Sequence, residues 1–239
     1  MSNLAGSVKE GLSRRIGPAG IGRLEYFLRP SLRAGWGGPL NGQEGRRRIC
    51  TDVIEALAAR VIVETGTFRG NTTEWFATFG VPVHSVEAEP RQYAYARLRL
   101  RGVSDRVHVT LGDSRLFLKQ LASDPTVPKV NAFFYLDAHW NADLPLADEI
   151  ETIMSTWTRS VIMIDDFAVP GDSYAYDDYG PGAVLDSRYL DSLSRPDLPR
   201  FYPSLPAYRE TGMKRGCVVL CNDSETENKL DALTSLRRG

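Results

Sequence analysis

The sequence predicts an α/β protein built on a doubly wound, mostly parallel sheet. Three observations support this fold class. Five short apolar runs are typical of buried strands, stretches with helix-like spacing separate them, and 239 residues suffice for one large domain. Strands that alternate with helices form parallel sheets with helices on both faces. A hydrophobic content of 42% and a charged content of 25% fit an ordinary globular protein with a sizeable core.

The five expected strands are apolar runs that favour burial on both faces of a sheet. The first reads "VIVETGT" and the last reads "SVIMIDDF". Polar or glycine-containing segments follow these runs, as connections between strands and helices require. The expected strands cover residues 61–67, 81–89, 106–113, 129–138 and 160–167.

The expected helices follow from apolar spacing and from residues that begin or end helices. Over 46–60, Ile49, Val53 and Leu57 share one helical face. The helix over 90–102 has Pro at its start and Gly at its end, which is the usual asymmetry. Asp or Ser begins the helix over 114–123. The remaining two helices are expected over 71–80 and 145–157.

The two ends of the chain have different patterns. Residues 1–45 are rich in Gly and Pro, so we expect an irregular extension with one short helix near Leu24 to Leu28. Such an extension can act as a lid or as the arm of a homodimer, and the main domain is expected over 46–239. Near the C-terminus, "RFYPSLPAYRETG" and "KRGCVVLCN" predict an antiparallel hairpin that turns near Thr211–Lys214.

Acidic residues follow every expected strand of the parallel sheet. In open α/β sheets, ligands bind outside the carboxyl ends of the strands. A sheet has no structural need for acids at that edge, so their recurrence after five strands indicates one shared crevice. These acids are Glu64, Glu87 with Glu89, Asp113, Asp137, and Asp165 with Asp166.

The segment "ETGTFRG" after the first strand places Glu64, Gly66 and Gly70 in the pattern E-x-G-x-x-x-G. Its glycines permit a tight turn and a close approach of the backbone to a ligand at a helix N-terminus. The pattern has neither the spacing of a nicotinamide fingerprint nor a phosphate-binding G-K-[ST]. With the later acids in order, residues 50–222 resemble the class I S-adenosylmethionine (SAM)-dependent methyltransferases, which have a Rossmann-like sheet.

This resemblance implies which residues bind SAM. The segment that contains Glu64, Gly66 and Gly70 would hold the methionine part, and Asn71 would contact the cofactor carboxylate. Glu87 lies twenty-one residues after Gly66, which suits an acid that binds the two ribose hydroxyls.

Two further assignments of the same kind complete the expected cofactor site. Glu89 is the alternative to Glu87 for the ribose. By the same resemblance, Asp113 or Ser114 in "GDS" would lie near the adenine amino group.

The segments "YLDAHW" and "IDDF" suggest a metal site. Three carboxylates that gather without a cation repel one another and must take up protons. Sets of oxygen ligands suit hard divalent cations such as Mg²⁺. The segments resemble those of metal-dependent small-molecule O-methyltransferases of the catechol and macrolide-sugar types. That resemblance implies Asp137, Asp165 and Asp166 as Mg²⁺ ligands.

His139 follows Asp137 by two residues. In the sugar-modifying branch of those enzymes, a His shortly after the first metal ligand is proposed as the general base, which implies that role for His139. A cation that binds the acceptor hydroxyl stabilises the developing alkoxide, and an imidazole of ordinary pKa can take the proton.

The sequence therefore predicts a metal-dependent O-methyltransferase that acts on a carbohydrate hydroxyl, with an oligosaccharide or a small glycosylated molecule as acceptor. Two alternatives stay open: a metal-independent methyltransferase that uses His139 as base, and a nicotinamide-binding oxidoreductase. A net charge of −1 and the absence of an Asn/Asp-Pro-Pro-aromatic motif argue against a nucleic-acid substrate. No run of about 18 apolar residues occurs. We therefore expect a cytoplasmic protein without a membrane partner.

Overall fold

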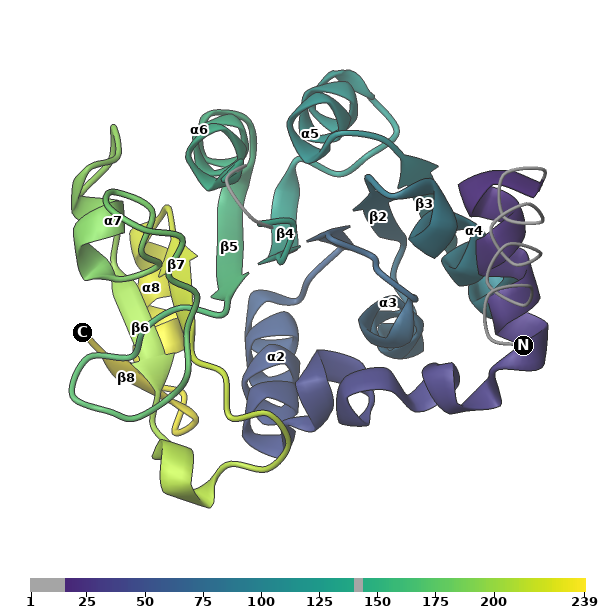
Figure 1. The fold of residues 1–239 in the computed structure, drawn as a ribbon. Coiled ribbons are helices and arrows are strands. Elements are labelled where there is room, and N and C mark those ends of the chain that lie inside the picture. Colours follow the sequence, from purple (N-terminus) through teal and green to yellow (C-terminus); the bar gives the residue numbers. More distant parts are fainter. Residues whose placement is uncertain (1–15, 140–143) are drawn as a thin grey trace.

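The structure is a computed structural model that describes residues 16–139 and 144–239. Within these ranges the strands form one eight-stranded sheet in the order β3-β2-β1-β4-β5-β7-β6-β8. Figure 1 shows the sheet with helices on both of its faces. The expected α/β fold class is confirmed.

The parallel part of the sheet contains five strands with β1 at its centre. Strand β1 pairs in parallel with β2 on one side and with β4 on the other, and β3 and β5 extend these two sides. Along the chain, β2 and β3 are added on one side of β1, and β4 and β5 are added on its other side. The carboxyl ends of β1, β2 and β4 therefore meet at a topological switch point. The bounds are β1 Val61–Thr65, β2 Val83–Glu87, β3 Val107–Leu111, β4 Val130–Leu136 and β5 Thr158–Asp165.

The other edge of the sheet is antiparallel. Strand β7 (Cys217–Cys221) pairs antiparallel with both β5 and β6 (Arg200–Pro203), which confirms the expected pairing of the two C-terminal strands. The connection from β6 to β7 contains the 3-10 helix η5 (Ala207–Arg209) and is longer than a tight hairpin turn. A last strand that the sequence did not indicate, β8 (Leu236–Arg238), pairs with β6.

The helices cover two separate cores. Buried side chains of α5, α6 and α7 pack on one face of the sheet, and those of α2, α3 and α8 pack on the other. The bounds are α2 Glu44–Leu57, α3 Asn71–Phe76, α4 Pro90–Arg99, α5 Ser114–Ser123, α6 Leu146–Thr156, α7 Ser187–Asp191 and α8 Ser224–Asp231. Two short 3-10 helices extend α3 and α4, namely η3 (Ala77–Phe79) and η4 (Leu100–Val103).

The extension is more regular than its composition indicates. Residues 16–28 are helical, and two 3-10 helices follow, η1 (Pro30–Gly37) and η2 (Pro39–Gly42). The helix lies beside α4, where a Cβ on Gly22 would come within 2.0 Å of the Arg91 carbonyl oxygen. Close packing of this kind outweighs the low helix propensity of glycine. Residues 1–15 of the expected extension lie outside the described residues.

No helix in the described part of the chain combines the length and the apolar character that a bilayer crossing requires.

Candidate active site

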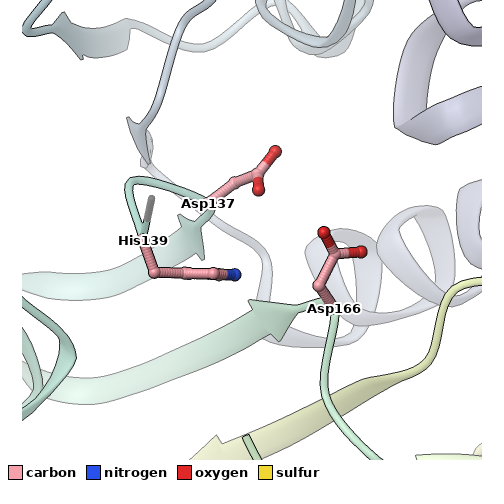
Figure 2. A group of neighbouring side chains, drawn as sticks. All are labelled: Asp137, His139 and Asp166. Atoms are coloured by element: carbon pink, nitrogen blue, oxygen red, sulfur yellow. The ribbon is translucent and has the colours of Figure 1, made fainter. Parts of the chain in front are cut away.

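Asp137, His139 and Asp166 come together at the carboxyl edge of the sheet. Asp137 and His139 follow β4, and Asp166 follows β5. One carboxylate oxygen of each Asp and one ring nitrogen of His139 lie within 4.8 Å of one another. Figure 2 shows the imidazole and the Asp166 carboxylate directed toward the same space, with Asp137 beside them. Two neighbouring parallel strands therefore supply all three side chains.

Gly66 fixes the position of the Asp137 backbone. The Asp137 N–H donates to the Thr65 carbonyl oxygen over 2.9 Å, which joins the ends of β4 and β1. Gly66 has a φ of 93°, and a Cβ there would lie 2.3 Å from the Asp137 carbonyl oxygen. Both the backbone conformation and the close approach require glycine. Gly66 therefore shapes the candidate site from beneath Asp137.

Replacing Gly66 with alanine is expected to destabilise the fold by more than the roughly 1 kcal/mol that a left-handed conformation costs a residue with a side chain. The added methyl must push the Asp137 backbone away. Gly80→Ala is the matched control, because Gly80 has a φ of 75° and its Cβ would meet nothing within 4 Å. Urea unfolding of both variants measures the difference. Equal losses would show that the contact with Asp137 has no cost.

The two adjacent aspartates after β5 do not lie together. Asp165 is fully buried, pairs with the Arg46 guanidinium and accepts a hydrogen bond from the Tyr135 hydroxyl. Asp166 adopts a left-handed conformation with a φ of 53°, which Asp tolerates better than most residues. The structure thus separates the pair that the sequence suggested as joint metal ligands, and Asp165 lies outside the three-residue cluster.

Arg215 and Asp177 complete the charges around this cluster. The Arg215 Nε donates to Asp166 Oδ1 over 2.7 Å, and its Nη2 pairs with Asp177 Oδ1. Two carboxylates, Asp166 and Asp177, thus pair with one guanidinium. Burial, together with the charges of Asp166 and Glu64, raises the pKa of Asp137 well above its usual range, and the charge of Arg46 opposes that shift.

His139 is enclosed by the protein. Its side chain has an exposed fraction of 0%, and neither ring nitrogen has a hydrogen-bond partner in the described chain. The Nε2 atom lies 4.0 Å from Asp177 Oδ2, and the Tyr179 hydroxyl donates to the His139 carbonyl oxygen over 2.8 Å. Burial lowers the pKa of His139, although Asp166 and Asp177 oppose that shift. A neutral ring with a free lone pair is the expected form.

Glu64 lies at the end of β1 and is buried. Its Oε2 accepts hydrogen bonds from the hydroxyls of Thr73 and Ser85, over 2.5 and 2.6 Å. Burial raises the pKa of Glu64 to about 7. Its Oε1 has no partner. Gly70 is the N-cap residue of α3 in a left-handed conformation, and Asn71 donates from Nδ2 to the Gly35 carbonyl oxygen of η1. Asn71 thus holds the extension, and its Oδ1 stays without a partner.

Glu87 links the loops that follow β1 and β2. Its Oε2 accepts from the Phe68 N–H over 2.6 Å and its Oε1 accepts from the Glu89 N–H over 2.8 Å. Burial raises the pKa of Glu87 to about 7. Glu89 is exposed at the start of α4. The placement at the strand end favours Glu87 as the acid that faces the crevice.

Asp113 is the N-cap residue of α5 and accepts from the N–H groups of Arg115 and Leu116. The hydrogen bond from the Arg115 side chain lowers the pKa of Asp113. Ser114 is the first residue of α5 and is buried. Next to it lies Glu149 of α6, which the sequence did not indicate.

The Glu149 carboxylate is fully buried, and neither oxygen has a partner with hydrogen-bond geometry. Burial raises the pKa of Glu149 to about 7, although the nearby hydroxyls of Ser114 and Thr65 oppose that shift. Since the unfolded value is lower, the folded state binds the proton more tightly.

This buried carboxylate predicts a pH dependence of stability. The contribution of Glu149 to the stability of the fold is fully present below its unfolded pKa and is lost as the pH rises through about 7. Glu149→Gln is therefore expected to match the wild type at pH 4.5 and to exceed it at pH 8 by about 3 kcal/mol at most. Urea unfolding at both pH values measures this. Asp148→Asn, an exposed neighbour on α6, is the control. A difference in unfolding free energy between Glu149→Gln and the wild type that is independent of pH would contradict the raised pKa of Glu149.

The sequence did not single out several residues that shape the site: Arg46, Tyr135, Asp177 and Arg215. Asp177 lies within 169–182, whose three Asp and three Tyr directly after β5 were a usable signal. Arg46 and Arg215 gave no local signal. Asp165, the partner of Arg46, lies more than a hundred residues away along the chain, and Asp177, a partner of Arg215, lies about forty residues away.

Comparisons with known proteins concern the fold. No family model and no curated protein matches the chain. The O-methyltransferase from Bacillus cereus in complex with SAH is similar in structure, with a TM-score of 0.54, 17% identity, and coverage of 90% of this chain and 97% of that one. The O-methyltransferase TomG from Streptomyces achromogenes, involved in tomaymycin synthesis and solved with SAM, is similar with a TM-score of 0.54 and 19% identity. The match covers 74% of this chain and 80% of that one.

An amino pentose methyltransferase from Micromonospora echinaspora, involved in calicheamicin biosynthesis and solved with SAM, is also similar. Its TM-score is 0.51 at 14% identity, over 76% of this chain and 93% of that one. The chain therefore has the Rossmann-like methyltransferase fold.

Proposed function

We propose that the protein is a SAM-dependent O-methyltransferase that uses a divalent cation and methylates a hydroxyl of a carbohydrate. The observation that carries this proposal is the convergence of Asp137, His139 and Asp166 at the carboxyl edge of a methyltransferase fold. In such sheets this edge is where ligands bind.

The residues at the switch point fit SAM. Several buried polar atoms in this part of the chain have no partner among the described residues, and such atoms normally have a ligand or water as partner. Those on or just after β1 are Glu64 Oε1, Thr65 Oγ1, Arg69 Nε and Asn71 Oδ1. Glu87 has accepted two backbone hydrogen bonds, yet a carboxylate has further lone pairs for ribose hydroxyls. The antiparallel β7 also departs from the 3-2-1-4-5-6 order of dinucleotide-binding sheets, which disfavours the nicotinamide alternative.

The charges of the cluster fit a dication. Asp137, Asp166 and Asp177 carry three negative charges when ionised, and Arg215 supplies one positive charge. Two negative charges are left in a partly buried space, where uncompensated charge is costly. Asp137 and Asp166 would hold the cation. Arg215 would orient the Asp166 carboxylate, because its Nε donates a hydrogen bond to Asp166 Oδ1.

When bound, SAM supplies the methyl group and a divalent cation lowers the pKa of an acceptor hydroxyl. The chain's own residues position the reactants. Arg215 and Asp177 restrain the 166–179 segment, because the Asp177 N–H also donates to the Asp166 carbonyl oxygen over 2.9 Å. Enclosure of His139 and Asp137 keeps water away from the reacting groups, which strengthens electrostatic interactions there.

A carbohydrate acceptor is supported by two observations. The amino pentose methyltransferase shares the fold. In addition, the segment tied to Asp166 exposes Tyr176 and carries Asp178 and Tyr179, and tyrosine with acids can bind sugar rings by stacking and hydrogen bonds.

Two measurements test this function. Calorimetry with SAM and with NAD should show binding of SAM alone, and binding of NAD alone would contradict the proposal. Methyl transfer from labelled SAM to a panel of mono- and oligosaccharides should stop on addition of EDTA and return with divalent metal. Transfer that survives chelation would favour the metal-independent alternative.

A further inference from the structure

His139 faces two carboxylates, and its ring has no hydrogen-bond partner among residues 16–139 and 144–239. One of its nitrogens lies within 4.8 Å of both an Asp137 oxygen and an Asp166 oxygen, and its side chain has an exposed fraction of 0%. Figure 2 shows the ring edge directed toward Asp166. A buried polar atom without a partner is rare in a folded protein and calls for an explanation.

Two roles are compatible with this position, general base or metal ligand. A general base must come within hydrogen-bond reach of the acceptor hydroxyl. The His139 ring is fully enclosed. The residues Asp137 and Asp166 are each only partly buried, and their carboxylates approach the ring from two sides. One cation could bind a ring nitrogen of His139 and one oxygen of each carboxylate, because these three atoms lie within 4.8 Å of one another. Neutral imidazole is also the commonest metal-ligating side chain.

We infer that His139 is a third ligand of the metal, with Asp137 and Asp166, and that the site selects a transition metal such as Zn²⁺ over Mg²⁺. This inference rests on the proposed function, since it concerns the same cation. It replaces the general-base role and the Mg²⁺ expected from the sequence.

The selectivity follows from the donor atoms. Mg²⁺ prefers oxygen ligands and keeps several of its waters, whereas imidazole nitrogen suits Zn²⁺ and other later transition metals. Asp177 is placed to orient the ring, because its Oδ2 lies 4.0 Å from His139 Nε2. Carboxylates commonly hold a ligating histidine in this way.

Electron spin echo measurements test the bond directly. Untagged full-length protein is stripped with EDTA and loaded with Mn²⁺ alone. We expect modulation from a directly bound ¹⁴N nucleus in the wild type and in His108→Asn, and none in His139→Asn. His108 is exposed on β3 and is the matched control.

Two outcomes would overturn the inference. Bound Mn²⁺ without ¹⁴N modulation in the wild type would remove His139 from the ligand set and leave the proposed function intact. No binding of Mn²⁺ would remove the metal site itself. The wild-type spectrum decides between these results even if a variant folds poorly.

Metal titrations give an independent test. Calorimetry with Zn²⁺ and with Mg²⁺ yields the ratio of the two affinities. His139→Asp replaces a nitrogen donor with oxygen, so the preference for Zn²⁺ is expected to shrink by roughly tenfold, that is about 1.4 kcal/mol. A ratio equal to that of the wild type would contradict the assignment.

Discussion

Asp137→Ala is expected to lower kcat/KM for methyl transfer by about a hundredfold or more, which corresponds to about 3 kcal/mol of lost transition-state stabilisation. The variant lacks a carboxylate that the proposed cation needs, and Asp166 and His139 alone hold the ion poorly. The expected loss lies in kcat as well as in KM, because the cation acts on the developing negative charge.

The same substitution is expected to leave the metal-free fold as stable as the wild type or more stable. Burial and Asp166 raise the pKa of Asp137, which means that its charged form is unfavourable where it lies. Function and stability thus make opposite demands at this residue. Steady-state kinetics and thermal unfolding without metal check the two effects. Asp197→Ala, an exposed carboxylate without a recorded partner, is the control. Near-normal turnover in Asp137→Ala would exclude it as a metal ligand.

Arg46→Ala is expected to destabilise the fold by about 3–5 kcal/mol, the usual result when one partner of a buried ion pair is removed. The Arg46 side chain has an exposed fraction of 1%, and its only recorded carboxylate partner is the fully buried Asp165. Its Nη2 also donates to the Gly216 carbonyl oxygen over 2.8 Å. The variant leaves Asp165 charged or forces it to take up a proton, and it removes one of the two hydrogen bonds to the Gly216 carbonyl oxygen, which still accepts from the Phe167 N–H.

Arg48 offers a matched control on the same helix, α2. Its side chain has an exposed fraction of 69% and lies 3.7 Å from Asp52. Arg48→Ala is therefore expected to cost less than about 1 kcal/mol. Urea unfolding measures both variants. Arg46→Met combined with Asp165→Leu should recover much of the loss, since apolar replacements often substitute for a buried pair. An Arg46→Ala protein as stable as Arg48→Ala would show that the pair adds nothing.

The parallel sheet was predictable because its strands are continuous apolar runs and its helices begin and end with clear signals. The acids after these runs also identified the correct edge. The antiparallel β7 and β6 could be paired, whereas β8 is only three residues long and lacks a strand pattern. The helix over 16–28 was expected only near Leu24 to Leu28, because its packing on α4, and not its composition, stabilises the earlier part.

The three carboxylates that the sequence suggested as ligands do not all come together, and the reason lies in strand geometry. Successive side chains of a strand point to opposite faces of the sheet. On β5, Val161 and Met163 face the α2 side, and Asp165 continues that alternation toward Arg46. Asp166 lies beyond the strand, where a left-handed residue redirects the chain toward Asp137. Adjacent acids at a strand end therefore rarely share one ion without such a change of direction. Asp177 and Arg215 depend on tertiary contacts that no local pattern encodes.

Gln43 gives the candidate site an unexpected dependence on the start of the chain. Its side-chain amide donates to the Arg215 carbonyl oxygen over 2.9 Å and accepts from the Arg215 N–H over 2.8 Å. A truncated protein that begins at residue 46 would keep every acid of the site and lose the clamp that sets the arginine between Asp166 and Asp177. The boundary at 45/46 stays a prediction, and the contacts of Gln43 join the two sides of it. Amide exchange should show the backbone of Arg215 opening together with residues 39–43.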